Sequence, residues 1–158
     1  MNTETETKER TLTITRTINA PRELVWKAWT NEKLMTEWWG PRGFTSSGCK
    51  LDPRPGGVFE ICMDHPDFPN HWSKGEFVEV KKPEKIVFTS RAFIDESGKA
   101  KLETINTVTL EEIGGKTKFT LHAMVTKATP EMKPALDGMN QGWNETIDKL
   151  ANLLETLK

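Results

Sequence analysis

Strict alternation of apolar and polar positions marks the first patterned segment of the chain. Over Thr11–Ile18, Leu12, Ile14 and Ile18 share one face, and four threonines share the other. This period of two predicts a strand with its β-branched threonines toward solvent. Arg16 falls on the apolar face, and we expect its long side chain to snorkel past the core, with a functional role as the alternative. Residues 1–9 are polar and lack apolar periodicity, so we expect a disordered tail there.

Two short helical patterns follow this strand. Pro21 suits the first turn of a helix over residues 21–29, and Thr30 or Asn31 can cap a second helix that Gly40-Pro41 ends. The apolar positions at helical spacing are Leu24, Val25, Ala28 and Trp29 in the first helix and Leu34, Met35 and Trp38 in the second. Because almost no loop separates them, the two helices should meet as a V.

Six further strands are predicted beyond residue 43. They are Phe44–Leu51, Val58–Met63, Trp72–Val80, Lys85–Arg91, Leu102–Glu111 and Lys116–Val125. The separators are rich in Gly, Pro, Asp and Ser, which indicates tight turns and an antiparallel meander. Within the second of these strands, Phe59, Ile61 and Met63 share one face.

A long amphipathic helix is predicted over about residues 131–157. Its apolar stripe consists of Leu136, Met139, Trp143, Ile147, Leu150, Leu154 and Leu157. Gly138 and Gly142 lie inside this pattern, and each costs roughly 1 kcal/mol relative to Ala in a helix. We therefore expect either a close approach of another backbone or an open space beside Met139 and Trp143.

This order of elements predicts an α+β helix-grip fold. A seven-stranded antiparallel sheet would curl around the long C-terminal helix, and the two short helices after the first strand would plug the open end. A single domain over residues 10–158 accounts for the whole pattern. Where sheet and helix diverge, such a grip leaves a cavity of the kind that binds ligands.

The chain resembles the START-like, helix-grip (SRPBCC) superfamily and, within it, the bacterial family similar to the activator of heat-shock chaperone ATPase (AHSA-type). The resemblance runs from about Thr11 to Leu157. The residues that carry it are Arg16, Ala20-Pro21, residues 25–30 (VWKAWT), 38–41 (WWGP), Gly43-Phe44, 52–57 (DPRPGG), 83–88 (PEKIVF) and Gly142-Trp143. It implies a binder of hydrophobic ligands, and related branches include polyketide aromatases and cyclases.

Composition narrows the classes of partner. The 158 residues carry 22 Lys and Arg against 23 Asp and Glu, so the chain lacks the basic face that nucleic acid or an anionic membrane surface requires. No apolar run approaches the ~20 residues of a spanning helix, and residues 1–10 lack the apolar core of a secretory signal. We expect a cytoplasmic protein with no nucleic-acid partner and no membrane partner.

Few side chains in the sequence suggest catalysis or metal binding. The segment Asp64–His71 gathers two His and two Asp, but its spacing fits no metal motif, so we expect a solvated loop, no metal and no cofactor. If this loop overhangs the cavity, its histidines could touch a ligand. Cys49 and Cys62 could be cross-strand neighbours, although a disulfide is not expected in a reducing compartment. Glu60, Glu76 and Glu103 should lie on surface faces, and any that is buried would be a candidate general base.

The leading functional hypothesis is a module that binds a small hydrophobic or aromatic molecule between the sheet and the C-terminal helix. The residues expected to contact the ligand are Trp39, Phe59, Ile61, Met63, Trp72, Met139, Gly142 and Trp143. No catalytic residue is assigned. The alternatives are an enzyme similar to polyketide cyclases or aromatases and a co-chaperone-like protein-interaction domain. The pattern also leaves open a homodimer formed through an edge strand such as Lys85–Arg91.

Overall fold

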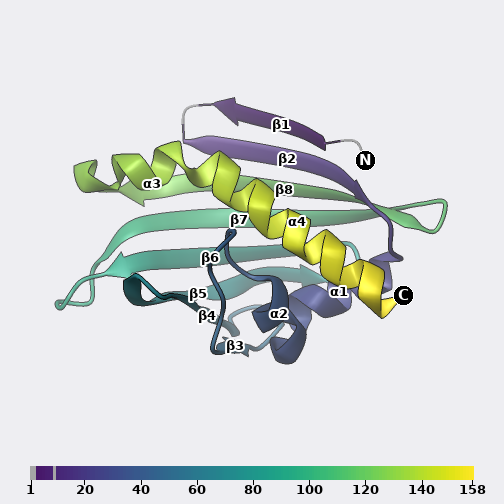
Figure 1. The fold of residues 1–158 in the computed structure, drawn as a ribbon, viewed down its shortest axis with the longest axis horizontal. Helices are drawn as coiled ribbons and strands as arrows, with labels where there is room; N and C mark the ends of the chain where they lie inside the picture. The colour runs from purple at the N-terminus through teal and green to yellow at the C-terminus, as the bar shows by residue number, and fades with distance from the viewer. Residues whose placement is uncertain (1–2, 9) are drawn as a thin grey trace.

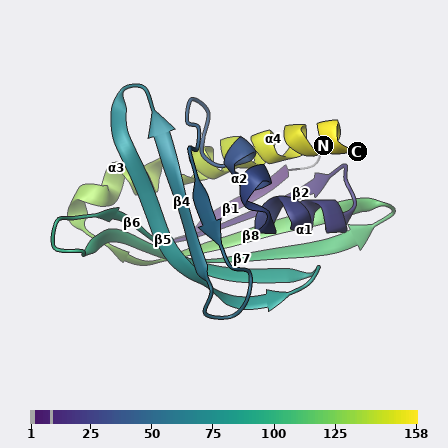
Figure 2. The same ribbon diagram turned by 90° about the horizontal axis from the view of Figure 1, so that it is seen from below.

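The structure, a computed structural model, describes residues 3–8 and 10–158. One antiparallel sheet of eight strands, in the order β1-β2-β8-β7-β6-β5-β4-β3, carries the helices on one side (Figures 1 and 2). The strands are β1 (Thr3–Lys8), β2 (Thr11–Ile18), β3 (Cys49–Leu51), β4 (Val58–His65), β5 (Phe68–Lys81), β6 (Lys85–Ile94), β7 (Ala100–Ile113) and β8 (Lys116–Ala128). In Figure 2, β4 and β5 rise toward the helices, so the helix-bearing face is concave. The fold is the predicted α+β helix grip.

The strand β1 corrects the prediction of a disordered tail for residues 1–9. Residues 3–8 pair antiparallel with β2, from Thr3 opposite Arg16 to Lys8 opposite Thr11, and residues 1, 2 and 9 lie outside the described residues. Arg10 adopts a positive φ of 60° next to β2. The pairing uses backbone groups along the edge of β2, so it needs no apolar residue and leaves no hydrophobic pattern in the sequence.

The other seven strands match the predicted ones, with two large differences in length, since β5 (Phe68–Lys81) is longer than the predicted Trp72–Val80 and β3 is shorter than predicted. Of the predicted strand Phe44–Leu51, only β3 (Cys49–Leu51) is regular, and Thr45 adds an isolated bridge to Asp64. The sheet therefore ends at β1 and β3. The segment Lys85–Arg91 was named as a possible dimer edge, but it belongs to β6, which lies between β5 and β7. Its backbone groups are already paired, so it cannot join a second copy.

Two short helices, α1 (Arg22–Thr30) and α2 (Glu32–Trp38), connect β2 to β3. Asn31 lies between them and caps α2, because its side-chain oxygen accepts a hydrogen bond from the Leu34 amide at 3.0 Å. The indole nitrogen of Trp38 donates to the carbonyl of Ala28 at 3.0 Å, which fixes the V between the helices. This part of the prediction is confirmed, including the cap.

The C-terminal helix is broken near its start, where the sequence pattern predicts one continuous helix. A 3₁₀ turn (Pro130–Met132) and the short α3 (Lys133–Asp137) precede α4 (Met139–Leu157), and Gly138 separates α3 from α4. In α4, Ile147, Leu150 and Leu154 are fully buried. The first two stripe residues of α4, Met139 and Trp143, are only half-buried, so this end of the helix is not packed tightly on the sheet.

Aromatic side chains fill the space between the short helices and the sheet. Trp29 is fully buried, with ring centroids 4.8 Å from Trp38 and 6.0 Å from Trp39. On the sheet side, Phe59 and Phe88 stack with centroids 4.1 Å apart and an interplanar angle of 4°. Aromatic pairs at these distances contribute beyond their buried area, so this cluster is a rigid block beside the C-terminal helix.

Arg16 corrects a second expectation, because its side chain does not snorkel to solvent. It is 3% exposed, and its guanidinium donates to Asp148 at 2.6 Å and to Asn144 at 3.2 Å, both on α4. A buried guanidinium needs a paired carboxylate to offset its lost hydration. Arg16 therefore joins β2 to the middle of α4.

We predict that Asp148→Ala lowers the free energy of unfolding by about 1–3 kcal/mol, because it leaves the buried guanidinium of Arg16 without its anion. The estimate is below that for fully buried pairs because the Asp148 side chain is 48% exposed. Urea unfolding monitored by circular dichroism measures the change. Glu155→Gln neutralises an exposed carboxylate of the same helix, which accepts a hydrogen bond from Asn19, and it should change stability by less than about 0.5 kcal/mol. Equal effects of the two variants would contradict this role of Arg16.

Candidate functional site

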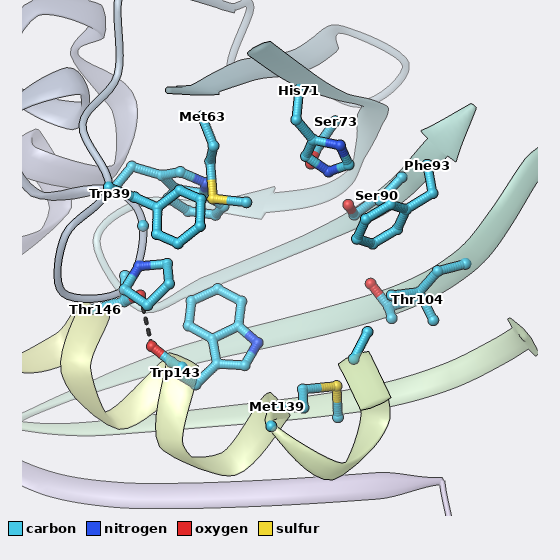
Figure 3. A pocket seen from close by; sticks show the side chains of 18 residues that line it. Trp39, Met63, His71, Ser73, Ser90, Phe93, Thr104, Met139, Trp143 and Thr146 are labelled. Atoms are coloured by element: carbon cyan, nitrogen blue, oxygen red, sulfur yellow. Dashed lines mark hydrogen bonds between the residues drawn. The ribbon is translucent and has the colours of Figure 1, made fainter. Parts of the chain in front are cut away.

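A cavity of about 390 Å³ lies between the concave face of the sheet and the first half of the C-terminal helical segment (Figure 3). Strands β4, β5, β6 and β7 form its sheet side, and α3, α4 and the loop over residues 39–44 form the opposite side. The volume falls within the range of ~300–1,000 Å³ that is typical of small-molecule sites.

One side of the cavity is apolar. Trp39, which directly follows α2, packs edge-to-face against Trp143 of α4, with centroids 5.5 Å apart and an interplanar angle of 83°. Met63 of β4 and Met139 of α4 complete this side. In Figure 3 these four side chains surround one end of the cavity. Thioethers are flexible and polarisable, so this wall can adapt to ligands of different outline.

The loop over residues 39–44 is fastened to α4 by two charged residues. The ammonium group of Lys149 donates to the carbonyl oxygens of Trp39, Gly40 and Phe44, at 3.3, 3.1 and 3.0 Å. Partial burial lowers the pKa of Lys149. Glu145 accepts a hydrogen bond from the backbone amide of Arg42 at 3.0 Å. These contacts hold one wall of the cavity at a fixed distance from the helix.

The glycines of this region have separate roles. Gly40 has a φ of +97°, which a residue with a side chain rarely adopts, and it lets the chain turn sharply after Trp39. Gly142 has ordinary helical surroundings, and a Cβ atom built there would lie 4.0 Å from the Cβ of Pro41. Gly138 and Gly142 both line the cavity. A larger side chain at Gly142 would therefore project between the helix and the loop, where the cavity lies.

The sheet side of the cavity carries polar groups. His71 and Ser73 of β5, Ser90 of β6 and Thr104 of β7 line it. His71 lies directly opposite Met63 in the β4–β5 pairing, which explains why it faces the concave side. Burial lowers the pKa of His71, so its imidazole is neutral at pH 7. Among the described residues that line the cavity there is no Asp, Glu, Lys or Arg.

Phe93 reaches the cavity through an irregularity in β6. Ala92 pairs with Leu102 and Ile94 with Ala100, while Phe93 between them has a φ of +54°. A bulky residue in this left-handed region is strained, and such strain is concentrated at functional sites. Regular alternation would turn Phe93 to the convex face. Instead it lines the cavity next to Ala92, and its ring centroid lies 4.4 Å from that of His71.

The structure brings five of the eight sequence-predicted ligand residues to the cavity: Trp39, Met63, Met139, Gly142 and Trp143. Phe59 and Ile61 share a face with Met63, but they lie deeper in the packed core, at 2% and 0% exposure. Trp72 pairs with Cys62, which has the opposite orientation to Ile61 and Met63, and its side chain lies outside the cavity. These three residues therefore do not line the cavity.

The segment Asp64–His71 forms the end of the β4–β5 hairpin. Its two histidines separate, because His71 lines the cavity while His65 packs between Phe44 and Phe68 at centroid distances of 4.8 and 4.7 Å. Within residues 3–8 and 10–158 no group of three or more His, Cys, Asp or Glu side chains is arranged to hold a metal ion.

The cysteines and carboxylates lie outside the cavity. Cys49 pairs with Ile61 and not with Cys62, the next residue along β4. Both thiols are free. Burial and the charge of Glu32 raise the pKa of Cys49 to about 11, and burial raises that of Cys62, so both thiols remain protonated at neutral pH. Glu103 is partly exposed and pairs with Arg91 and Lys127. Glu60 and Glu76 do not line the cavity either.

Two features of the site were not predicted from the sequence. These are the polar side chains on the sheet side of the cavity and the hydrogen bonds that hold the loop over residues 39–44 to α4. Strand Trp72–Val80 alternates poorly, because β5 shifts register between Phe77 and Glu79, so its faces could not be assigned from the pattern. Lys149 lies beside the apolar stripe in the sequence and looks like an ordinary surface lysine. Its three acceptors are backbone carbonyls, which have no sequence signature.

A curled antiparallel sheet closed by a C-terminal helix, with a cavity between them, defines the START-like helix-grip class. The family model described as "Activator of Hsp90 ATPase homolog 1-like protein" matches residues 19–155. The chain therefore belongs to this family. Its resemblance to the AHSA-type family, stated from the sequence, is confirmed.

Solved structures support the same fold. A protein from Nitrosomonas europaea is similar at 28% identity, with a TM-score of 0.77 and coverage of 94% of this chain and 96% of the other. A protein from Arthrobacter aurescens has 22% identity and a TM-score of 0.83, covering 97% and 91%. A protein from Silicibacter pomeroyi called AHSA1 has 21% identity and a TM-score of 0.77, covering 94% and 99%. Among curated proteins none matches this chain.

We predict that Gly142→Ala raises the free energy of unfolding by about 0.5–1 kcal/mol, because alanine favours the helix and its Cβ has ordinary room beside Pro41. Gly75→Ala is the contrasting variant, since its Cβ would overlap the carbonyl of Thr89 and destabilise the sheet. Urea unfolding of both variants measures the difference. Destabilisation by Gly142→Ala would contradict the 4.0 Å separation between the Cβ position of residue 142 and the Cβ atom of Pro41.

A second prediction concerns His71, which is half-buried and neutral at pH 7. Below pH 6.5 the unfolded chain protonates His71 more readily than the folded chain does, so stability should fall as the pH falls from 7.5 to 5. His71→Gln should reduce this loss, and the melting temperature measured against pH reports it. His122→Gln, whose residue does not line the cavity, is the control. Identical pH profiles for wild type and His71→Gln would contradict the neutral state of His71.

Proposed function

We propose that this chain binds a small, largely apolar or aromatic molecule in the cavity between the sheet and the α3–α4 segment. The observation that carries the proposal is the cavity itself, since it is bounded by two tryptophans and two methionines at a point where a tightly packed core would otherwise be expected. Protein interiors are normally close-packed, so an apolar space of this size next to a rigid aromatic cluster favours a ligand site.

The walls of the cavity support binding by a preformed site. Lys149 and Glu145 hold the loop, and Arg16 holds α4 on β2, so the space does not depend on the ligand for its shape. A preorganised site loses less conformational entropy when it binds. Apolar area removed from water would supply most of the affinity, at roughly 25 cal/mol per Å² before the costs of association.

The chemistry of the lining favours a binder over a cyclase-like or aromatase-like enzyme. Among the described lining residues, His71 is the one titratable group, and proton transfer in an enzyme of that kind would call for an acid and a base acting together. The interaction-domain alternative would call for an exposed apolar patch in place of a concave cavity. No helix among the described residues is long and apolar enough to cross a membrane.

The test uses N-phenyl-1-naphthylamine, an uncharged dye whose emission rises in apolar surroundings. The wild-type protein should bind it with a Kd on the order of 10 µM, equivalent to about 7 kcal/mol. Binding should also change the intrinsic tryptophan fluorescence, because Trp39 and Trp143 line the cavity. Gly142→Leu should weaken binding about tenfold or more, because its side chain would fill the space beside Pro41.

The matched control is Asn152→Leu, which adds a leucine to the exposed side of the same helix and should leave the Kd unchanged. Melting temperatures of both variants establish that they fold. Absence of dye binding by the wild type would overturn the proposed function. Equal affinity of wild type and a folded Gly142→Leu variant would show that the dye binds elsewhere, and this too would overturn it.

A further inference from the structure

Three hydroxyl groups lie side by side on the sheet side of the cavity. Ser90 of β6 is paired directly with Thr104 of β7. Lys74 pairs with Arg91, which places Ser73 of β5 diagonally across from Ser90, within the range at which side chains on one face of a sheet can share a ligand. Figure 3 shows the three residues on the side of the cavity away from Trp39.

These hydroxyls have hydrogen-bonding capacity that the described residues do not use. Ser73 is 91% buried, and neither its hydroxyl nor that of Ser90 makes a hydrogen bond to the described residues. The hydroxyl of Thr104 accepts from the Asn106 amide at 3.1 Å, and its own proton is left to donate. A hydroxyl can both donate and accept a hydrogen bond, so hydroxyls with unused capacity on a cavity wall indicate where a ligand's polar atoms would lie.

The described lining residues include no charged side chain that could pair with a charged ligand. With no Asp, Glu, Lys or Arg among the described lining residues, a carboxylate or ammonium ligand would lose its hydration without gaining a counter-charge. His71 lies two residues before Ser73 on the same face of β5, and its neutral ring can donate or accept a hydrogen bond. The polar side of the cavity is therefore suited to uncharged oxygen atoms.

We propose that the ligand is an uncharged planar molecule with a hydroxyl or carbonyl oxygen at one edge. Its apolar body would lie between Trp39, Trp143 and the two methionines, and its oxygen would bond to the hydroxyl row of Ser73, Ser90 and Thr104. This inference rests on the proposed function, because it assigns a ligand class to the same cavity. The hydroxyl row orients the ligand, because the oxygen-bearing edge can form hydrogen bonds only on that side of the cavity.

The experiment compares three two-ring probes by titration of the tryptophan fluorescence at pH 7.5: naphthalene, 2-naphthol and 2-naphthoate. The variant Ser73→Ala/Ser90→Ala/Thr104→Val removes the hydroxyl row with little change in shape. It should bind 2-naphthol about three- to tenfold more weakly than wild type does, while its affinity for naphthalene stays the same or rises. The wild type should bind 2-naphthoate at least about tenfold more weakly than 2-naphthol.

Thr146→Val is the matched control. Thr146 also lines the cavity, but its hydroxyl already donates to the carbonyl of Gly142 at 2.8 Å, so its removal should leave the preference for 2-naphthol over naphthalene unchanged. The single variant Ser90→Ala replaces the triple variant if the latter does not fold, and it should show the same selective loss at smaller size.

The outcomes separate this inference from the proposed function. If naphthalene and the dye bind but removal of the hydroxyl row leaves 2-naphthol binding intact, the ligand class is wrong and the binding function stands. Binding of 2-naphthoate as tight as that of 2-naphthol would likewise overturn the ligand class alone. If neither the dye nor any of the three probes binds the wild type, both proposals fall.

Discussion

A single α-helix is too narrow to cover the concave face of an eight-stranded sheet, and the rest of the structure follows from this constraint. Eight strands about 4.8 Å apart span about 34 Å, whereas a helix with its side chains is about 10–12 Å wide. The second half of α4 packs tightly through Ile147, Leu150 and Leu154, and α1 and α2 cover the neighbouring area with their tryptophans. The area that neither covers, over β4 to β7, is where the cavity lies.

The cavity persists because its boundaries are held independently of one another. Arg16 holds α4 on β2, and the aromatic cluster around Trp29 holds α1 and α2 on the sheet. Lys149 donates to three carbonyls of the loop that follows α2, which fixes the position of the loop relative to α4. The break at Gly138 lets α3 turn across the end of the cavity while α4 keeps its own course.

Much of the fold could be predicted from periodicity, because burial on one face leaves a regular pattern. Thr11–Ile18 matches β2 at both ends, and the Asn31 cap was predicted from residue type and position. The break at Gly138 could not be predicted, since the apolar stripe continues through Met139 and Trp143 at helical spacing. The strand β1 was missed because its pairing involves backbone groups and buries no apolar pattern.

The candidate site was predictable on its helix side, but on its sheet side only Met63 was predicted correctly. Glycines beside Met139 and Trp143 pointed to open space, and both residues line the cavity. Phe59 and Ile61 were assigned to the cavity because strand alternation gives the face of a residue but not its depth in the core. Phe93 lies beyond the predicted strand Lys85–Arg91, and its positive φ turns it against the alternation. Such local strain depends on tertiary packing and is invisible in a single sequence.

Intermolecular nuclear Overhauser effects from ¹³C-methyl-labelled methionines would test the central claim most directly, with N-phenyl-1-naphthylamine as the bound molecule. Met63 and Met139 line the cavity, whereas Met35 is fully buried in the core and Met124 is 40% exposed outside the cavity. The account predicts contacts from the dye protons to the methyl groups of Met63 and Met139 and none to those of Met35 and Met124. Contacts confined to Met124, or to no methionine while the dye is bound, would contradict it.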